Sequence, residues 1–556
     1  MNNRIEVNPC VFPQEESDCF PSKFVRTFSN SILDSQSSLC SGIPSFLIFR
    51  PLAPNVSVPR IKCRDSIPRC GNCKSYLSPF ISVNVQSRFW RCPVCGGKNS
   101  LIHFSPLYDF KVVYDRKEMH EIVYDIVISN DKSIKCSRSF IFVMDENLLI
   151  SKTNSKEKMI ECIKSIKSVI KPNDKICCIL FSSIITIVNF KRKCLKSFVD
   201  CDISFCKQDD SFFVNAEDAL EILIGILENV FIKEERNAIP FTAVMWGCKL
   251  IGKKGGKMIL FSSGRCSERI EPMHKVLLEN AISLNIFRYA PILELEKCAE
   301  QTGGVSRSFG QIDSLISLFT VSTAWNANSF LRISNGYEIT KIMGPGSQAL
   351  NEIYTYPILT SEQSVIYEFK QNSSSNNFFF QFAFRFFDDE NNNFIRIING
   401  KLPCTSIIQF PIDESALALY ILRKKIYEPI ETTFYSKISF LKDALPSSLP
   451  NFPILLYNGK FKSQNFMKST CIERFAISVF PFKMILNNKA FEILYSSDMI
   501  IIYPEPNISE KELIKSSLRY FGFSELIFYT PANESEFQDM FNSSSSKESI
   551  QWYSLI

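Results

Sequence analysis

Apolar residues between positions 138 and 325 follow two alternating patterns. Residues 140–145 and 176–181 are continuous apolar runs, which are typical of strands buried on both faces. Between them, apolar residues recur at helical spacing over 159–170, and Pro172 ends the predicted helix. This alternation predicts an α/β domain with a mostly parallel sheet and helices on both sides. The same patterns predict further strands at 184–190, 257–261 and 281–289 and further helices at 216–231, 241–251 and 293–301.

The pattern changes after residue 325. Short strand-like runs are separated there by turns rich in Ser and Asn, which is typical of a β-sandwich. The predicted strands are 331–342, 364–370, 378–388 and 393–398, and an earlier one at 46–51 stops at Pro51. Residues 410–490 have a helix-like pattern. The C-terminal part returns to α/β, with strands at 498–503 and 526–529 and a helix at 510–521.

Length and composition narrow the class of protein. A chain of 556 residues predicts three or four domains. With 45% hydrophobic and 22% charged residues, it is neither wholly disordered nor a coiled-coil rod nor a collagen-like fibre. The N-terminal residues lack the apolar stretch of a signal peptide, and no tract is long and apolar enough to cross a bilayer. We therefore expect a cytosolic protein whose 20 cysteines are mostly reduced thiols.

The strongest chemical signal is a pair of CxxC motifs. Cys70 and Cys73 are followed, 18 residues later, by Cys92 and Cys95. Two such knuckles at this separation suit tetrahedral Zn²⁺, and four thiolates leave no open position for water, so the predicted site is structural rather than catalytic. A pair of disulfides is the alternative, which a reducing compartment disfavours.

Zinc ribbons also occur in nucleic-acid-binding proteins. The segment between the knuckles carries only three cations, Lys74, Arg88 and Arg91, and is not a basic stripe interleaved with aromatic residues. The net charge of +6 is small for this length. We therefore expect no nucleic-acid partner.

Apparent enzyme motifs fail when their context is considered. Residues 247–254 approach the phosphate-loop pattern, but Lys254 stands where a magnesium-binding hydroxyl is required, and the segment leads from a helix into a strand. Asp145 ends a strand where a von Willebrand-type α/β domain carries its DxSxS metal motif. Asn147 and Leu149 replace both serines. The three histidines have no partner spacing, so the sequence predicts no catalytic residue.

Nearly the whole chain resembles the two related inner-coat subunits of COPII vesicles. Residues 69–80, RCGNCKSYLSPF, are similar to the RCxxCRxYxNPF block of the cargo-adaptor subunit, and Trp90-Arg91-Cys92 follows as in its WxCxxC block. Residues 212–217, 255–264 and 301–304 resemble successive landmarks of the adaptor's trunk domain. The two-residue gap between Cys70 and Cys73 fits the adaptor better than the GTPase-activating subunit.

The resemblance implies a multidomain fold of zinc ribbon, von Willebrand A-like α/β trunk, β-sandwich, helical domain and C-terminal gelsolin-like domain. The expected boundaries are 1–65 and 326–410 for the β-sandwich, 66–104 for the zinc ribbon, 105–325 for the trunk, 411–490 for the helical domain and 491–556 for a short gelsolin-like domain. The long disordered region with which adaptors begin is missing from this chain, so contacts made by that region are not expected.

The implied function is non-enzymatic. An adaptor binds the sorting signals of cargo and SNARE proteins, forms a heterodimer with the second inner-coat subunit, and contacts a Sar-type small GTPase and the outer coat. It would be cytoplasmic and peripheral on endoplasmic reticulum exit sites and on COPII vesicle membranes. The alternatives are the GTPase-activating subunit, for which Arg519 lacks a supporting motif, and a zinc-ribbon nucleic-acid binder.

The resemblance also implies where ligands bind. Basic residues beside the first knuckle meet acidic sorting signals in the family, and Arg69 and Lys74 occupy these positions. Two carboxylate-binding cations on a rigid turn are chemically suited to that role. An anionic membrane would meet a basic face, for which Lys191, Arg192 and Lys193, with Lys196, form one candidate cluster. Lys253, Lys254 and Lys257 form another. Ordinary solvated loops remain the alternative for both clusters.

Overall fold

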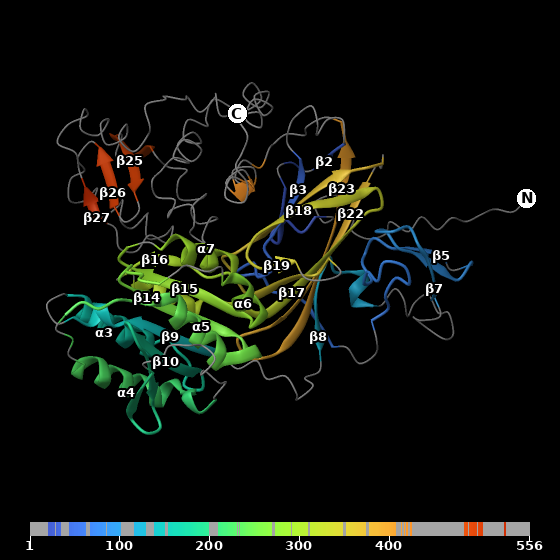
Figure 1. The fold of residues 1–556 in the computed structure, drawn as a ribbon. Helices are drawn as coiled ribbons and strands as arrows, with labels where there is room; N and C mark the ends of the chain where they lie inside the picture. The colour runs from blue at the N-terminus through green and yellow to red at the C-terminus, as the bar shows by residue number, and fades with distance from the viewer. Residues whose placement is uncertain are drawn as a thin grey trace, which may run out of the picture.

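The computed structural model places a β-sandwich between an α/β domain and a small zinc-finger-like module (Figure 1). It describes residues 20–406, single residues 413, 416, 419, 420, 423 and 424, and four strands beyond residue 480. The gaps before residue 406 are 28, 30, 35–43, 63–66, 85, 102–115, 129–137, 151–153, 199–209, 231, 233, 269–272, 291, 310–311, 349–351 and 374–376. No helix within these described residues is long and apolar enough to cross a bilayer.

The α/β domain is built on an eight-stranded sheet with the order β12-β11-β10-β9-β14-β15-β16, in which β13 also pairs with β10. The neighbours β10, β9, β14, β15 and β16 are parallel, whereas β11 and β12 form an antiparallel edge. The predicted mostly parallel sheet is therefore confirmed. Its strands are β9 Ser139–Asp145, β10 Lys175–Phe181, β11 Ile185–Asn189, β12 Cys194–Phe198, β13 Val214–Asn215, β14 Gly256–Ser262, β15 Ile282–Arg288 and β16 Ser306–Ser308.

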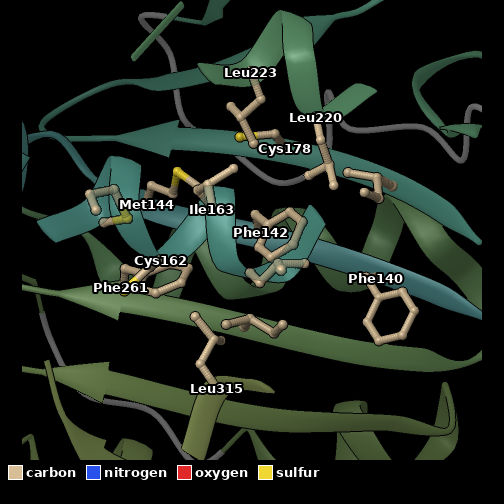
Figure 2. Packing of buried hydrophobic residues seen from close by; sticks show 14 of the residues in the cluster. Phe140, Phe142, Met144, Cys162, Ile163, Cys178, Leu220, Leu223, Phe261 and Leu315 are labelled. Carbon is tan, nitrogen blue, oxygen red and sulfur yellow. The ribbon is translucent and has the colours of Figure 1, made fainter. Parts of the chain in front are cut away.

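Successive residues of a strand point to opposite sides of its sheet. Because the residues on both sides of this sheet are apolar, helices cover both faces. On one face, Phe140, Phe142 and Met144 of β9 pack with α3, α4 and α8, as Figure 2 shows from close by. On the other face, Ile141 and Val143 pack with α5, α6 and α7. The helices are α3 Ser155–Lys167, α4 Ala216–Asn229, α5 Pro240–Ile251, α6 His274–Glu279, α7 Leu293–Gln301 and α8 Ile312–Thr320.

The β-sandwich has one sheet with the order β1-β3-β21-β18 and a second with the order β19-β20-β17-β22-β23-β8-β4, in which β2 also pairs with β23. Aromatic residues fill the space between them, as where Phe49 stacks on Phe382 with ring centroids 4.4 Å apart. The strands are β1 Val25–Arg26, β2 Ile32–Leu33, β3 Ser45–Phe49, β4 Arg60–Lys62, β8 Val123–Ile128, β17 Thr323–Ile333, β18 Tyr337–Met343, β19 Ser347–Gln348, β20 Tyr354–Thr360, β21 Val365–Gln371, β22 Asn377–Phe387 and β23 Asn393–Thr405.

Two predictions about this region were wrong. The single strand expected at 331–342 is split between β17 and β18, which lie in different sheets. The chain turns at Gly336, whose φ of 91° is a conformation that favours glycine. In addition, β8 pairs with β23 of the sandwich, although residues 105–325 were assigned to the α/β domain.

The zinc-finger-like module contains a three-stranded antiparallel sheet of β5 Ser82–Asn84, β6 Phe89–Arg91 and β7 Lys98–Ser100. Near the C-terminus, β24 Lys483–Leu486, β25 Lys489–Ser496, β26 Met499–Tyr503 and β27 Ile527–Tyr529 form a mixed sheet. The last two confirm strands predicted from the sequence. Most of the expected helical domain at 411–490, the helix at 510–521 and Arg519 lie outside the described residues.

Candidate functional site

The two CxxC motifs form backbone turns of the same design. In the first, the Cys70 N–H donates to Ser75 O and the Lys74 N–H donates to Cys70 O, at 2.9 and 3.0 Å. In the second, the Cys92 N–H donates to Gly97 O and the Gly96 N–H donates to Cys92 O, both at 2.9 Å. The two turns therefore present their cysteines in equivalent positions.

The four sulfur atoms converge on one point. The Sγ atoms of Cys70, Cys73, Cys92 and Cys95 all lie within 4.8 Å of one another. Two of the separations, Cys70 to Cys95 and Cys73 to Cys92, are 3.5 and 3.6 Å. Four thiolates about 2.3 Å from a tetrahedral zinc ion lie roughly 3.8 Å apart, so the sulfur set fits zinc. A disulfide needs about 2.05 Å, and all four cysteines are free.

Polar groups contact the sulfur atoms. The Gly97 N–H donates to Cys95 Sγ at 3.4 Å and Asn99 Nδ2 donates to Cys70 Sγ at 3.5 Å. Hydrogen bonding from Cys92 is the largest cause that lowers the pKa of Cys73 to about 4, whereas the hydrogen bond to Cys73 raises the pKa of Cys92 and burial raises the pKa of Cys95. The environment therefore favours a thiolate, which is the form that binds metal, at Cys73.

Arg69 and Lys74 flank the first knuckle, and both are exposed. The Arg69 guanidinium carbon lies 3.9 Å from the centroid of the Tyr76 ring, and Arg69 and Tyr76 form an isolated antiparallel bridge. Burial lowers the pKa of Arg69, but a guanidinium stays protonated at neutral pH. Lys74 has a φ of 59°, and its Nζ donates to Gly71 O at 2.7 Å. Two cations therefore stand on one turn, each with a defined conformation.

The sandwich holds both knuckles by their backbone. Arg332 Nε donates to Cys73 O and Asn335 Nδ2 donates to Cys95 O, each at 2.8 Å. Gln381 holds Tyr76 from both sides, accepting its N–H at 2.6 Å and donating to its carbonyl at 3.0 Å. The sequence analysis missed these three residues, since they lie 240 to 305 positions from the groups they bind and belong to no motif.

Arg332 is the only one of these three residues that carries charge. Burial lowers its pKa, and the charges of Cys73 and Cys92 oppose that shift. Its guanidinium carbon also lies 4.4 Å from the centroid of the Phe330 ring. The buried Nη1 has no hydrogen-bond partner within the described part of the chain. Arg332 is therefore a cation beside the sulfur cluster.

The two predicted basic clusters differ. Lys191, Arg192 and Lys193 are exposed on the turn between β11 and β12. The prediction for Lys257 was wrong, because this residue of β14 is only 2% exposed. Its Nζ donates to Leu318 O at 2.6 Å and to Thr323 Oγ1 at 3.0 Å, so it cannot reach a membrane surface.

The degenerate metal motif at the end of β9 is occupied by internal hydrogen bonds. Asp145 Oδ1 accepts the Asn147 N–H at 2.9 Å, and Oδ2 accepts the N–H and hydroxyl of Ser263. Arg236 pairs with Glu146 at 3.1 Å. The phosphate-loop-like segment runs from α5 through a 3-10 turn, Gly252–Lys254, into β14, which is the wrong order for that loop.

The zinc-finger-like module and the β-sandwich each match a known domain family. The Sec23/Sec24 zinc finger matches residues 67–103. The Sec23/Sec24 beta-sandwich domain matches residues 324–405. These two parts of the chain are therefore similar to the zinc finger and the beta-sandwich domain of Sec23/Sec24 proteins. The match to this zinc finger and the four converging sulfur atoms together indicate that the chain binds structural zinc.

Relatives of the chain carry Sec24 names. It is 21% identical over 503 residues to protein transport protein SEC24-2 of Naumovozyma castellii, covering 77% of this chain and 55% of the relative. It is 20% identical over 521 residues to protein transport protein SEC24 of Eremothecium gossypii, covering 80% of this chain and 58% of that relative. The chain thus spans just over half the length of these relatives. Its fold is similar to that of the human COPII-coat protein Sec24c, with a TM-score of 0.77, 14% identity and coverage of 96% of this chain and 94% of that one.

Proposed function

We propose that this chain is a non-enzymatic subunit of the COPII inner coat that binds acidic sorting signals of cargo at the first zinc knuckle. The observation that carries the proposal is the pair of exposed cations, Arg69 and Lys74, on a turn held by sulfur ligands on one side and by the sandwich on the other. A rigid turn lowers the entropy lost when a flexible peptide binds. The Sec24 names of the relatives support the same role.

Lys74 gives this proposal a second support. Lys74 and Gly96 occupy equivalent positions in the two knuckles, and both have positive φ, 59° and 69°. Glycine adopts this conformation without strain, whereas an L-residue with a side chain loses about 1 kcal/mol or more. A lysine at a position that favours glycine suggests that its ammonium group has a use. One of its three donors binds Gly71 O, and the exposed ammonium can donate to a carboxylate as well.

The four cysteines have a structural role in this proposal. Cys70, Cys73, Cys92 and Cys95 are the zinc ligands, and the ion supplies positive charge that holds four thiolates together. With every coordination position filled by sulfur, the zinc binds no substrate. The ion therefore fixes the turn that carries Arg69 and Lys74, and no chemical conversion takes place there.

The wider role is inferred from the similarity to Sec24 proteins. The subunit would form a heterodimer with the second inner-coat subunit and contact a Sar-type small GTPase and the outer coat at endoplasmic reticulum exit sites. The exposed turn of Lys191, Arg192 and Lys193 would face anionic lipid, where each cation contributes about 1 kcal/mol. Stimulation of the GTPase by this chain alone would instead favour the activating subunit.

The test is binding of a tail peptide with acidic residues, compared with the same peptide carrying Gln in their place. Lys74→Gly removes the cation and relieves the backbone, so zinc content and thermal midpoint should be kept or raised while acidic-peptide affinity falls about tenfold. Arg69→Gln should also weaken binding.

Lys98→Gln is the matched control, because Lys98 is an exposed cation on β7 of the same module. It should leave binding unchanged. If Lys74→Gly, Arg69→Gln and the unaltered chain bind the acidic peptide with equal affinity, the assigned site is wrong. If the unaltered chain binds neither the acidic peptide nor its Gln counterpart, cargo binding at this site is contradicted.

A further inference from the structure

The end of β17 and the turn after it bind both zinc knuckles at equivalent positions. Arg332 binds the carbonyl of Cys73, the second cysteine of the first knuckle, and Asn335 binds the carbonyl of Cys95, the second cysteine of the other. The Asn335 N–H also donates to Val94 O at 3.1 Å. These partners lie within four residues of one another, so one short segment of the sandwich holds both halves of the sulfur cluster.

The charge of the cluster explains why one of the two holding residues is a cation. Four thiolates and one Zn²⁺ carry a net charge of −2. A negative centre placed against the sandwich is costly to desolvate unless a nearby positive group offsets it. Arg332 is partly buried beside the cluster, and its charge interacts with Cys73 and Cys92. Its Nε binds Cys73 O, which leaves the buried Nη1 without a hydrogen-bond partner in the part of the chain that the structure describes.

We propose that Arg332 is a charge-balancing and positioning residue of the zinc site, through which zinc retention is coupled to docking of the module on the sandwich. The inference rests on the assignment of Cys70, Cys73, Cys92 and Cys95 as ligands. Groups that surround metal ligands commonly change metal affinity 10- to 100-fold when they are altered. Because coupling is reciprocal, loss of zinc must also weaken the hold of the β17–β18 turn.

A simpler role would be mechanical. Arg332 lies over the Phe330 ring and donates one hydrogen bond, and both contacts would help to pack the module without any effect of charge. The two roles predict different results for Arg332→Lys and Arg332→Gln. Lysine keeps the positive charge and loses the planar group, whereas glutamine keeps an amide donor and loses the charge.

The experiment measures zinc release from the full chain under excess chelator, with a colorimetric zinc indicator. Arg332→Gln should release zinc 10- to 100-fold faster than the unaltered chain, and Arg332→Lys should stay within a few-fold of it. Arg385→Gln is the control, because Arg385 is an exposed arginine on β22 of the same sheet. It should release zinc at the unaltered rate. Unchanged release from Arg332→Gln, or equal acceleration in the Gln and Lys variants, overturns the proposal.

A second measurement needs no variant at Arg332. Hydrogen exchange of the unaltered chain, with and without zinc, should show faster exchange at residues 332–337 after zinc removal and unchanged exchange in β14. Unchanged exchange at 332–337 overturns the coupling. Cys73→Ser tests the ligand assignment separately from the role of Arg332. Full zinc content in Cys73→Ser refutes the ligand set. Zinc loss from Cys73→Ser, together with an unchanged rate of zinc release from Arg332→Gln, refutes only the role of Arg332.

Discussion

Arg332 and Gln381 lie opposite each other on β17 and β22; Arg332 binds the last residue of the first zinc knuckle, and Gln381 binds the backbone that follows it. Arg332 binds Cys73 O, and Gln381 binds the N–H and carbonyl of Tyr76. Lys74 lies between the two held residues. The sandwich therefore determines the conformation of the turn that carries this cation, and the zinc module is not an independent appendage.

We predict that Gln381→Leu loosens this turn. Leucine fills a similar volume but leaves the buried N–H and carbonyl of Tyr76, and Asn399 Oδ1 at 2.7 Å, without their partner. An unsatisfied buried polar group costs about 1–3 kcal/mol, so destabilisation of about 2 kcal/mol or more is expected. The measurement is the thermal midpoint together with hydrogen exchange at Tyr76.

Gln348→Leu is the control for that substitution, because Gln348 is exposed on the short edge strand β19. It should shift the midpoint little. An equal shift in both variants would mean that the bonds of Gln381 contribute nothing specific.

Hydrophobic patterning was sufficient to predict the α/β domain. The continuous apolar runs at 140–145 and 176–181 became β9 and β10, and the helical spacing between them became α3. Such patterns are local, because strand and helix periods repeat within a few residues. The four cysteines could be found for the same reason: each CxxC motif forms a turn from adjacent residues.

Long-range polar contacts could not be predicted in this way. Arg332 and Gln381 each lie between two apolar neighbours in their strands, and their partners are more than 250 positions away. The turn at Asn335-Gly336 did carry a local signal, since this dipeptide marks turns, but the surrounding apolar residues suggested one continuous strand. Lys257 was misjudged because charge predicts exposure unless a buried partner is known.

Lys257 leads to a prediction about pH. The ammonium is buried 5.0 Å from the centroid of the Trp325 ring, and burial lowers its pKa to about 7 from an ordinary value of 10.5. Between these two values the unfolded chain binds one proton more at this site than the folded chain. Stability should therefore rise with pH over this range, by up to about 1.4 kcal/mol per pH unit, and be lost again as pH falls toward 7.

The test is denaturant unfolding of Lys257→Met and of the unaltered chain between pH 7 and 10. The difference in stability between them should change with pH by the slope above, because methionine has no proton to lose. Lys249→Met, on the exposed side of α5, is the matched control for the loss of a lysine. A pH dependence for Lys257→Met no greater than that for Lys249→Met would contradict the lowered pKa of Lys257.

A buried ion pair joins β15 to α7. Arg288 Nε pairs with Glu296, whose side chain is fully buried, and Ser306 Oγ donates to the same carboxylate at 3.2 Å. Glu296→Gln removes the negative charge and leaves the guanidinium uncompensated. We expect destabilisation of about 3–5 kcal/mol, measured by denaturant unfolding.

The exposed pair of Arg265 and Glu235 provides the comparison. Both side chains are more than half exposed, so Arg265→Gln should cost less than about 1 kcal/mol. Similar losses for Glu296→Gln and Arg265→Gln would show that burial adds nothing to the first pair.

Two glycines of the α/β domain should respond in opposite ways to alanine. Gly304 follows α7, and a Cβ there would lie 1.8 Å from the carbonyl oxygen of Leu284 in β15. Gly225 lies within α4, and a Cβ there would meet nothing within 4 Å. Gly304→Ala must push two backbone segments apart, whereas Gly225→Ala only gains helix propensity, worth up to about 1 kcal/mol.

Thermal unfolding checks the pair directly. Gly304→Ala should lower the midpoint by several degrees or prevent folding, and Gly225→Ala should keep or raise it. A Gly304→Ala variant as stable as the unaltered chain would mean that α7 and β15 are not as close as the structure places them. Both changes add the same methyl group to the same domain, so a difference larger than the helix-propensity gain of about 1 kcal/mol comes from the space around each glycine.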